Sequence, residues 1–167
     1  MSEPMAYLIT WRTYGTWLRG DARGSVDRAH QAYDSPLIEP QPAWERFTIG
    51  AHLHEAPFRI SAVMVPAIER AIVDTSMRRG WSLEAANVRS NHVHVVVSAH
   101  VTPERVLTAF KANATQALRA MNLIPPERTR LWVRHGSTRY LWTEENRAAA
   151  IDYVVNRQGS PLRNRDR

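Results

Sequence analysis

Two histidines stand two residues apart in the stretch Asn91–Ser98, which reads NHVHVVVS. Its alternation and β-branched content are typical of a β-strand, in which successive side chains point to opposite faces. His92 and His94 should therefore share one face, while Val93, Val95 and Val97 lie on the opposite, core-facing side. Two imidazoles placed in this way can direct lone pairs at one divalent cation, because imidazole is a common metal ligand. A strand with two histidines on its solvent-exposed face is the alternative interpretation.

A tyrosine on the last predicted helix could act as a nucleophile. This helix should run from Glu144 to about Arg157, with Gly159 after its end. Its inward stripe is predicted to be Ala148, Ile151 and Val155. Tyr153 lies about 200° from Ile151 on an ideal helix and should point away from that stripe. Such a tyrosine is either a solvated surface residue or a functional one. The competing tyrosines are Tyr7, Tyr14, Tyr33 and Tyr140.

The overall composition favours one basic domain. The chain has 167 residues, a formal charge of +6 and a pI near 10.4, which favours a polyanionic partner, usually nucleic acid. A coding bias toward arginine is the alternative explanation, since Lys111 is the only lysine. The absence of cysteine excludes disulfides and thiolate metal sites. With no apolar run of about 18 residues and no signal-peptide pattern, we expect a cytoplasmic protein that does not bind membranes.

The predicted elements alternate as strand, helix, strand, strand, helix, strand and helix. They are Ala6–Tyr14, Pro66–Arg79, Ser82–Ser90, the histidine strand, a helix from Thr102 to before Pro125, Thr138–Trp142 and the tyrosine helix, with a short strand-like piece at Leu131–His135. The first six have the βαββαβ order of a ferredoxin-like fold. We therefore predict an α+β, RRM-like antiparallel sheet with helices on one face and an added C-terminal helix that carries the tyrosine.

One domain should span residues 1–159, with an irregular insertion at about 21–60 that is rich in turn residues. Residues 160–167 form an arginine-rich tail that is expected to be disordered. A second pair of alternating histidines, His52 and His54, lies in the insertion without strand character. We interpret that pair as surface histidines.

The histidine pair on a strand, followed by a tyrosine on a late helix, resembles the HUH single-tyrosine transposases of small insertion sequences. Their relatives, the REP-associated tyrosine transposases, are the nearer match. The likeness extends to Leu8–Gly15 (LITWRTYG), Trp17–Asp21 (WLRGD) and Asn91–Val97 (NHVHVVV). His92 and Tyr153 are 153 − 92 = 61 residues apart, a separation of the size that the family uses.

The resemblance implies a metal-dependent reaction on single-stranded or hairpin DNA. His92, His94 and an amide side chain of the last helix would bind Mg²⁺ or Mn²⁺, which polarises the scissile phosphate. Tyr153 would attack that phosphate, leaving a 5′-phosphotyrosine and a free 3′-hydroxyl, and a second 3′-hydroxyl could reverse the step. The protein could work as a monomer or as a homodimer.

The amide ligand departs from the family's pattern, which places it four residues after the tyrosine. Here that position is Arg157, with Asn156 before it and Gln158 after it. On an ideal helix Gln158 points roughly 140° away from Tyr153, so a one-residue bulge would be needed to bring it round. Asn156 shares a face with Tyr153 and could bind the metal directly. We favour Gln158 and keep Asn156 as the alternative.

Two further expectations concern binding and rival functions. The candidate phosphate contacts are Arg12, Lys111, Arg134 and Arg139. A non-catalytic or domesticated nucleic-acid-binding protein on the same fold is the main rival to an active enzyme. A histidine-triad hydrolase would need a third histidine where this chain has Val96, and a metal hydrolase barrel would need a far longer chain.

Overall fold

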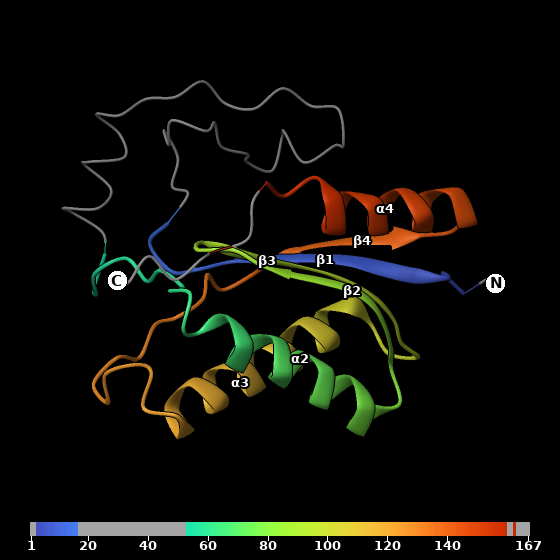
Figure 1. The fold of residues 1–167 in the computed structure, drawn as a ribbon. Coiled ribbons are helices and arrows are strands. Elements are labelled where there is room, and N and C mark those ends of the chain that lie inside the picture. Colours follow the sequence, from blue (N-terminus) through green and yellow to red (C-terminus); the bar gives the residue numbers. More distant parts are fainter. Residues whose placement is uncertain (1–2, 17–52, 160–161, 163–167) are drawn as a thin grey trace.

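The computed structural model of the protein describes residues 3–16, 53–159 and 162. Figure 1 shows a sheet between two layers, with two helices on one face and one helix on the other. The strands are β1 (Ala6–Arg12), β2 (Ser82–Val88), β3 (His92–Ser98) and β4 (Ser137–Leu141). The helices are α2 (Val65–Arg79), α3 (Pro103–Ala120) and α4 (Glu144–Asn156).

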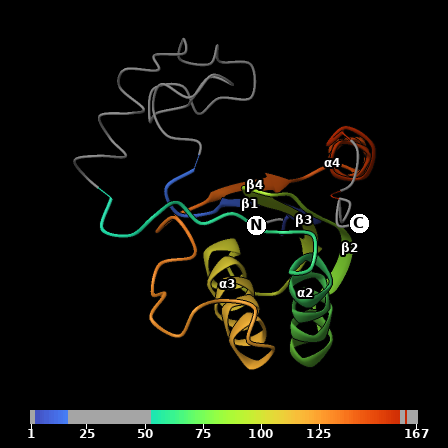
Figure 2. The same ribbon diagram turned by 60° about the vertical axis from the view of Figure 1, so that its left-hand side comes forward.

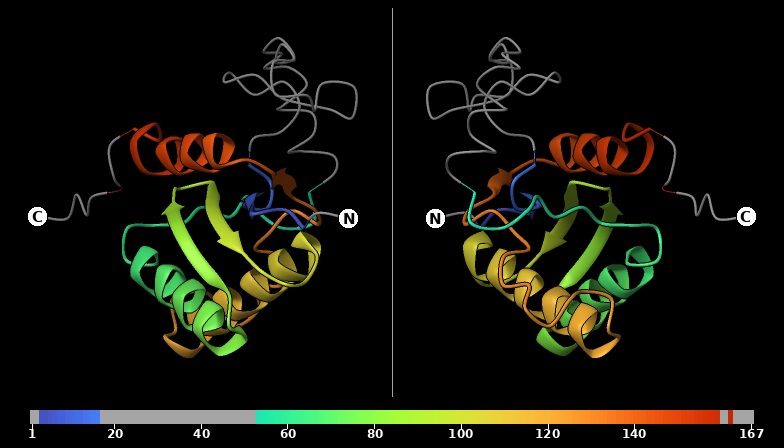
Figure 3. Two further views of the ribbon diagram at one scale, coloured as in Figure 1. Left: turned by 90° about the vertical axis from the view of Figure 1, so that its right-hand side faces the viewer. Right: turned by 90° about the vertical axis from the view of Figure 1, so that its left-hand side faces the viewer.

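The sheet has the strand order β2-β3-β1-β4, and every neighbouring pair is antiparallel. With α2 and α3 as the crossover helices, this is the ferredoxin-like arrangement, so the predicted α+β fold class is confirmed. Figure 2 looks nearly along α4, which contacts β2 and β3. In both views of Figure 3, α2 and α3 lie together below the sheet and α4 lies above it.

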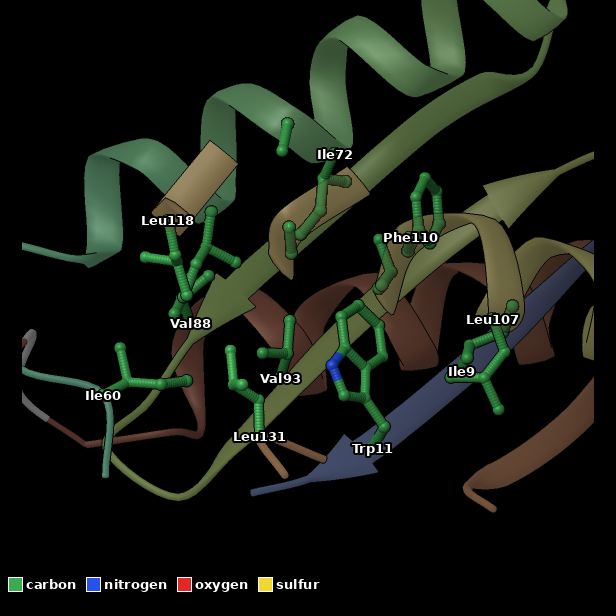
Figure 4. Close-up of a cluster of buried hydrophobic side chains, with 14 of the residues drawn as sticks. Ile9, Trp11, Ile60, Ile72, Val88, Val93, Leu107, Phe110, Leu118 and Leu131 are labelled. Atoms are coloured by element: carbon green, nitrogen blue, oxygen red, sulfur yellow. The ribbon is translucent and has the colours of Figure 1, made fainter. Parts of the chain in front are cut away.

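The larger core lies between the sheet and helices α2 and α3. Trp11 is fully buried there and its ring stacks on Phe110 of α3, with centroids 6.1 Å apart. Val93, Val95 and Val97 face this core from β3, as their alternation predicts. Figure 4 shows Trp11 and Val93 among side chains of α2 and α3, such as Ile72 and Phe110, with Leu131 beside them.

A second apolar cluster lies on the opposite face, beneath α4. Ala150 and Val154 are buried there against Leu8 and Val96 of the sheet. Of the predicted inward stripe of α4, only Ile151 packs against this cluster, whereas Ala148 is exposed and Val155 is 56% exposed. The reason is that α4 carries alanines at 148–150 and two valines side by side at 154 and 155, so that its sequence fits more than one buried face. The sheet selects the face whose small and branched side chains fit between the strands.

Polar contacts complete the docking of α4. Asn87 Nδ2 of β2 donates to the carbonyl oxygen of Val154 at 3.0 Å. Arg147 Nε lies 2.5 Å from Glu84 Oε2, and the Arg147 guanidinium also reaches Glu144 at 2.8 Å. The position of α4 on the sheet is thus fixed at both ends of the helix. A hydrogen bond from the Asn87 side chain holds its C-terminal end, and an ion pair of Arg147 holds its N-terminal end.

Several predicted boundaries shift. β1 ends at Arg12, and instead of a strand at 131–135 there is one isolated bridge between Thr13 and Trp132. Phe58 and Ile60, at the end of the predicted irregular insertion, are buried in the core. The rest of that insertion, 21–52, lies outside the described residues, as does the tail apart from residue 162.

None of the helices in the described part of the chain is long and apolar enough to cross a membrane.

We expect Val154→Ala to lower the free energy of unfolding by about 1–3 kcal/mol, because it removes buried methyl groups beneath α4. The matched variant Val155→Ala alters the neighbouring, exposed side chain and should change stability by less than about 0.5 kcal/mol. Urea denaturation followed by circular dichroism measures both. If Val155→Ala were the more destabilising of the two, α4 would be docked in the other rotation.

Candidate active site

His92 and His94 lie on the α4 side of β3. Their rings are 4.6 Å apart at 72°. In the register of β1 and β3, Thr10 lies opposite His94 and Arg12 opposite His92, so all four side chains share this face. The common face predicted from the alternation is the one observed.

Each imidazole is oriented by a neighbouring polar side chain. Asn91 Oδ1 lies 2.7 Å from His92 Nδ1, and Thr10 Oγ1 lies 2.6 Å from His94 Nδ1. Because an amide oxygen only accepts, His92 Nδ1 carries the proton in this arrangement and Nε2 is left with its lone pair. The Thr10 hydroxyl can accept from His94 Nδ1 in the same way. Both orienting bonds are of the kind that hold metal-binding histidines in one tautomer.

The environment of His94 keeps its ring neutral. Only 5% of the residue is exposed. Burial and the neighbouring charge of His92 lower the pKa of His94 to about 3. Neutral imidazole is the form that binds metals, so His94 is in the ligand form throughout the physiological pH range.

Gln158 reaches the histidines because of the rotation of α4. It lies four residues after the buried Val154, and residues four apart share one helix face. The helix ends at Asn156, and the side chain of Gln158 then turns toward the sheet. Gln158 Oε1 lies 3.4 Å from His92 Nε2, and its Nε2 donates to the carbonyl oxygen of Tyr153 at 3.1 Å. No bulge in the helix is required.

The alternative amide, Asn156, has a different partner. Its Nδ2 donates to Asp152 Oδ1 at 2.8 Å, and the residue is exposed. Of the two candidate amides, the structure brings Gln158 to the histidines and leaves Asn156 on the outer surface of α4.

Tyr153 lies beside the histidines in the same chain. Its ring centroid is 5.3 Å from that of His94, at 73°, and the residue is 38% exposed. The predicted exposure of Tyr153 is confirmed, although the buried face of α4 differs from the predicted one. Tyr153 borders the buried stripe rather than opposing it. The tyrosine and the histidines meet within one subunit, so the assembled group needs no second copy.

The donor atoms suit a cation. With Asn91 Oδ1 accepting from His92, the two atoms that face each other across 3.4 Å, His92 Nε2 and Gln158 Oε1, are both acceptors. Two acceptors in contact repel each other unless a proton or a metal ion lies between them. The described residues contain no group of three or more His, Cys, Asp or Glu side chains that could hold a metal. A ligand set here would therefore consist of two imidazoles and one amide.

The four predicted phosphate contacts separate in space. Arg12 and Arg139 lie on the histidine face, since Arg12 pairs with His92 and Arg139 with Leu8 in the sheet register. Lys111 is on α3, beyond the opposite face, and its ammonium donates to the carbonyl oxygens of Val133, Arg134 and His135 at 2.7, 3.4 and 3.1 Å. Burial lowers the pKa of Lys111 to about 8. Lys111 thus holds residues 133–135 in place through hydrogen bonds to their backbone. The side chain of Arg134, within this segment, is exposed.

Sequence reasoning missed three residues that build the site. Asn91 and Thr10 orient the two imidazoles, and Asn87 fixes α4 to β2. Asn91 could have been found from its place directly before the histidine pair. Thr10 and Asn87 act across strands, and their roles depend on a register that the sequence does not state.

The lowered pKa of His94 predicts that the stability of the metal-free protein depends on pH. The folded-state pKa lies below the unfolded value of 6.5, so this contribution is complete above pH 6.5 and is lost as the pH falls toward 3. Between pH 7 and 5, His94 should account for a loss of about 2 kcal/mol in the free energy of unfolding. Urea titrations in the presence of a chelator should show that the free energy of unfolding falls less between pH 7 and 5 for His94→Gln than for the wild type. Equal losses would mean that His94 takes up a proton in the folded state.

Comparison with known proteins gives a fold. No model of a known protein family matches the sequence, and no curated protein matches it. Among solved structures, a REP-associated tyrosine transposase bound to a REP hairpin aligns with a TM-score of 0.52 at 10% identity, over 92% of this chain and 66% of that one. A candidate transposase from Deinococcus radiodurans R1 aligns at 0.49 and 15% identity, over 96% and 95%. This chain therefore has the fold of a REP-associated tyrosine transposase, and at this identity the likeness concerns the fold.

Proposed function

We propose that the protein is a metal-dependent DNA strand transferase that cuts and rejoins single-stranded DNA through Tyr153. The observation that carries the proposal is the convergence of four side chains, from β3 and the end of α4, on one sheet face. Tyr153 lies against His94, and Gln158 lies against His92. The arrangement matches what the sequence resemblance implies, and the fold agrees with it.

In this proposal, His92, His94 and Gln158 would hold Mg²⁺ or Mn²⁺, and the bound cation would supply Lewis acidity that polarises the scissile phosphate and stabilises the charge that develops on its oxygens. All three protein ligands are uncharged, so they leave the full charge of a divalent cation available to an anionic phosphodiester. Asn91 and Thr10 keep the two ligand nitrogens turned toward the same point.

The Tyr153 oxygen attacks phosphorus and forms the new bond to the 5′ side of the DNA. The bond between phosphorus and the 3′ oxygen breaks, the phenol gives up its proton, and the departing 3′ oxygen gains one. The product is a 5′-phosphotyrosine and a 3′-hydroxyl, and the number of phosphodiester bonds is conserved. Attack by a second 3′-hydroxyl reverses the sequence and joins two strands without a nucleotide cofactor.

Single-stranded DNA with a hairpin is the proposed substrate. The chain carries a formal charge of +6, and Arg12 and Arg139 lie on the same sheet face as the histidines. Guanidinium groups beside a reacting phosphate can neutralise and position the backbone on either side of it. The solved transposase with this fold is bound to a REP hairpin, and we extend that class of ligand to this chain.

A non-catalytic DNA-binding protein is the second candidate. The observation that favours it is the ligand set, which contains no carboxylate and takes its amide from the residue after the usual position. A metal held weakly by such a set would leave a protein that binds DNA and cuts it poorly. Formation of a covalent adduct distinguishes the two functions.

Tyr153→Phe should abolish covalent attachment of a labelled hairpin oligonucleotide in the presence of Mn²⁺, because it removes only the attacking oxygen. The adduct is measured by denaturing gel electrophoresis. The matched variant Tyr14→Phe alters a tyrosine that packs against the core on the α2 and α3 side of the sheet, and it should still form the adduct. An adduct formed by Tyr153→Phe would mean that another tyrosine attacks. If the wild type attaches to none of the hairpins tested, the non-catalytic alternative is correct.

Metal binding can be tested without any reaction. We expect Gln158→Ala to weaken Mn²⁺ binding by about tenfold or more in titrations followed by electron paramagnetic resonance, and His92→Ala or His94→Ala to abolish it. Asn156→Ala is the matched control, two residues away, and should bind Mn²⁺ like the wild type. The opposite order, with Asn156→Ala defective and Gln158→Ala normal, would reassign the amide ligand.

A further inference from the structure

A pocket of about 420 Å³ lies away from the histidines, between the start of β1, the start of α3 and β4. Its volume is within the range of about 300–1,000 Å³ typical of ligand sites. The residues that matter for its chemistry are Glu3, Tyr7, His100, Thr102, Arg105 and Tyr140. Tyr7 and Tyr140 belong to the sheet face that α2 and α3 cover, so the pocket is on the other side of the sheet from Tyr153.

Tyr7 points to a polar ligand in this pocket. The residue is only 6% exposed, and its ring packs edge-on against Tyr140 with centroids 5.3 Å apart. No residue in the described part of the chain bonds to its hydroxyl, which is not among the buried polar atoms left without a partner and therefore opens into the pocket. A polar group of a ligand in the pocket can take the place of the water that reaches this hydroxyl.

An aromatic surface adjoins the pocket. The rings of Tyr140 and Trp142 are stacked, with centroids 5.9 Å apart and planes inclined by 13°. They are 44% and 52% exposed, which is unusual for a stacked aromatic pair of this size. They lie on and just after β4, which is the last strand on its side of the sheet. Exposed, coplanar rings beside a polar pocket suit a flat ligand with a polar edge, and nucleobases have that shape.

The charges favour a base over a phosphate. Arg105 contributes a guanidinium to the pocket, but Glu3 lines it too and Glu104 lies next to Arg105. Burial, then Tyr140, Glu3 and Glu104, raise the pKa of Tyr7, so that its hydroxyl stays protonated and can donate to a ring nitrogen or carbonyl. A site with mixed charge and several donors and acceptors matches the edge of a base better than it matches a dianionic or monoanionic group.

We propose that this pocket and the Tyr140–Trp142 surface bind unpaired bases of the DNA strand that flanks the scissile phosphate. The inference rests on the proposed function, because it takes the same single-stranded DNA as the ligand. Residues next to each other on a strand face opposite sides, so Arg139 lies on the Tyr153 face and Tyr140 on the pocket face of β4. A single strand that passes Arg139 can cross this edge of the sheet and place its bases on Tyr140 and Trp142.

The test compares two hairpin oligonucleotides with short or long unpaired flanks, of 4 and 12 nucleotides, binding to the full-length protein in a chelator, so that no cleavage occurs. Fluorescence anisotropy should give tighter binding for the long flanks. Trp142→Ala should weaken long-flank binding about 5- to 100-fold, the usual effect of lost base stacking, and leave short-flank binding unchanged. Tyr7→Phe should weaken long-flank binding about 2- to 10-fold, the usual effect of one lost hydrogen bond, and also leave short-flank binding unchanged. Trp142→Phe retains an aromatic ring and should keep part of the affinity. Tyr7→Phe removes a hydroxyl without a protein partner, so the fold should be unaffected.

Met77→Ala is the control, since it changes an exposed side chain of α2 that the pocket does not include. The proposal is wrong if long flanks add no affinity, or if Tyr7→Phe and Trp142→Ala both bind long flanks like the wild type. It is also wrong if Trp142→Ala converts a dimer into a monomer in sedimentation with DNA affinity unchanged, because the surface would then join two copies.

The two proposals fail in different ways. Adduct formation on the short-flank hairpin, which does not involve the pocket, tests the function of Tyr153. An adduct without any flank effect would overturn the pocket inference alone. Flank-dependent binding that is lost in Tyr7→Phe, without an adduct under any condition, would overturn the strand-transfer function and support the pocket.

Discussion

The burial of Val154 under α4 is the interaction on which the candidate site depends. Val154 is fully buried in the small cluster with Leu8 and Val96, and its carbonyl oxygen accepts a hydrogen bond from Asn87. Together these contacts fix both the place and the rotation of the helix. Tyr153, one residue earlier, is then brought to the border of the buried stripe, over His94. Gln158, four residues later, comes round to the sheet side next to His92. The packing of Val154 therefore positions both the candidate nucleophile and the candidate third ligand.

The sequence predicted the strand that carries the histidines, the face they share and the ferredoxin-like order, because β-strand alternation and the start of α3 are strong local signals. It did not predict the rotation of α4. In that helix, apolar residues occur on more than one side, and only the shape of the sheet surface decides between Val154 and Val155. The unpredicted rotation of α4 also explains why the position of Gln158 appeared anomalous in the sequence. Measured from the buried Val154 rather than from Tyr153, it is an ordinary sheet-facing position.

The electrostatics of the site follow from its burial. α4 and the sheet exclude water from His94, which keeps the imidazole neutral, and Gln158 adds a second uncharged donor. Strong negative charge is absent from this group, so a bound cation would not be neutralised by the protein and could act on a phosphate. Arg12 and Arg139 lie on this face in β1 and β4, and Arg89 is close enough for its charge to lower the pKa of His94 further. In the proposed function, Arg12 and Arg139 would hold the DNA backbone beside the site.

β4 is a short strand at the edge of the sheet, so a ligand that passes around it can contact both faces. Arg139 and Tyr140 are neighbours in sequence, yet one faces the histidines and the other faces the aromatic pocket. A rigid duplex cannot follow that turn around a single strand, since DNA is stiff over about 150 base pairs. An unpaired strand has no such stiffness and exposes its bases for stacking. If the protein binds single-stranded DNA as proposed, the geometry of this one edge strand would favour such a ligand over duplex DNA, independently of the proposed chemistry at Tyr153.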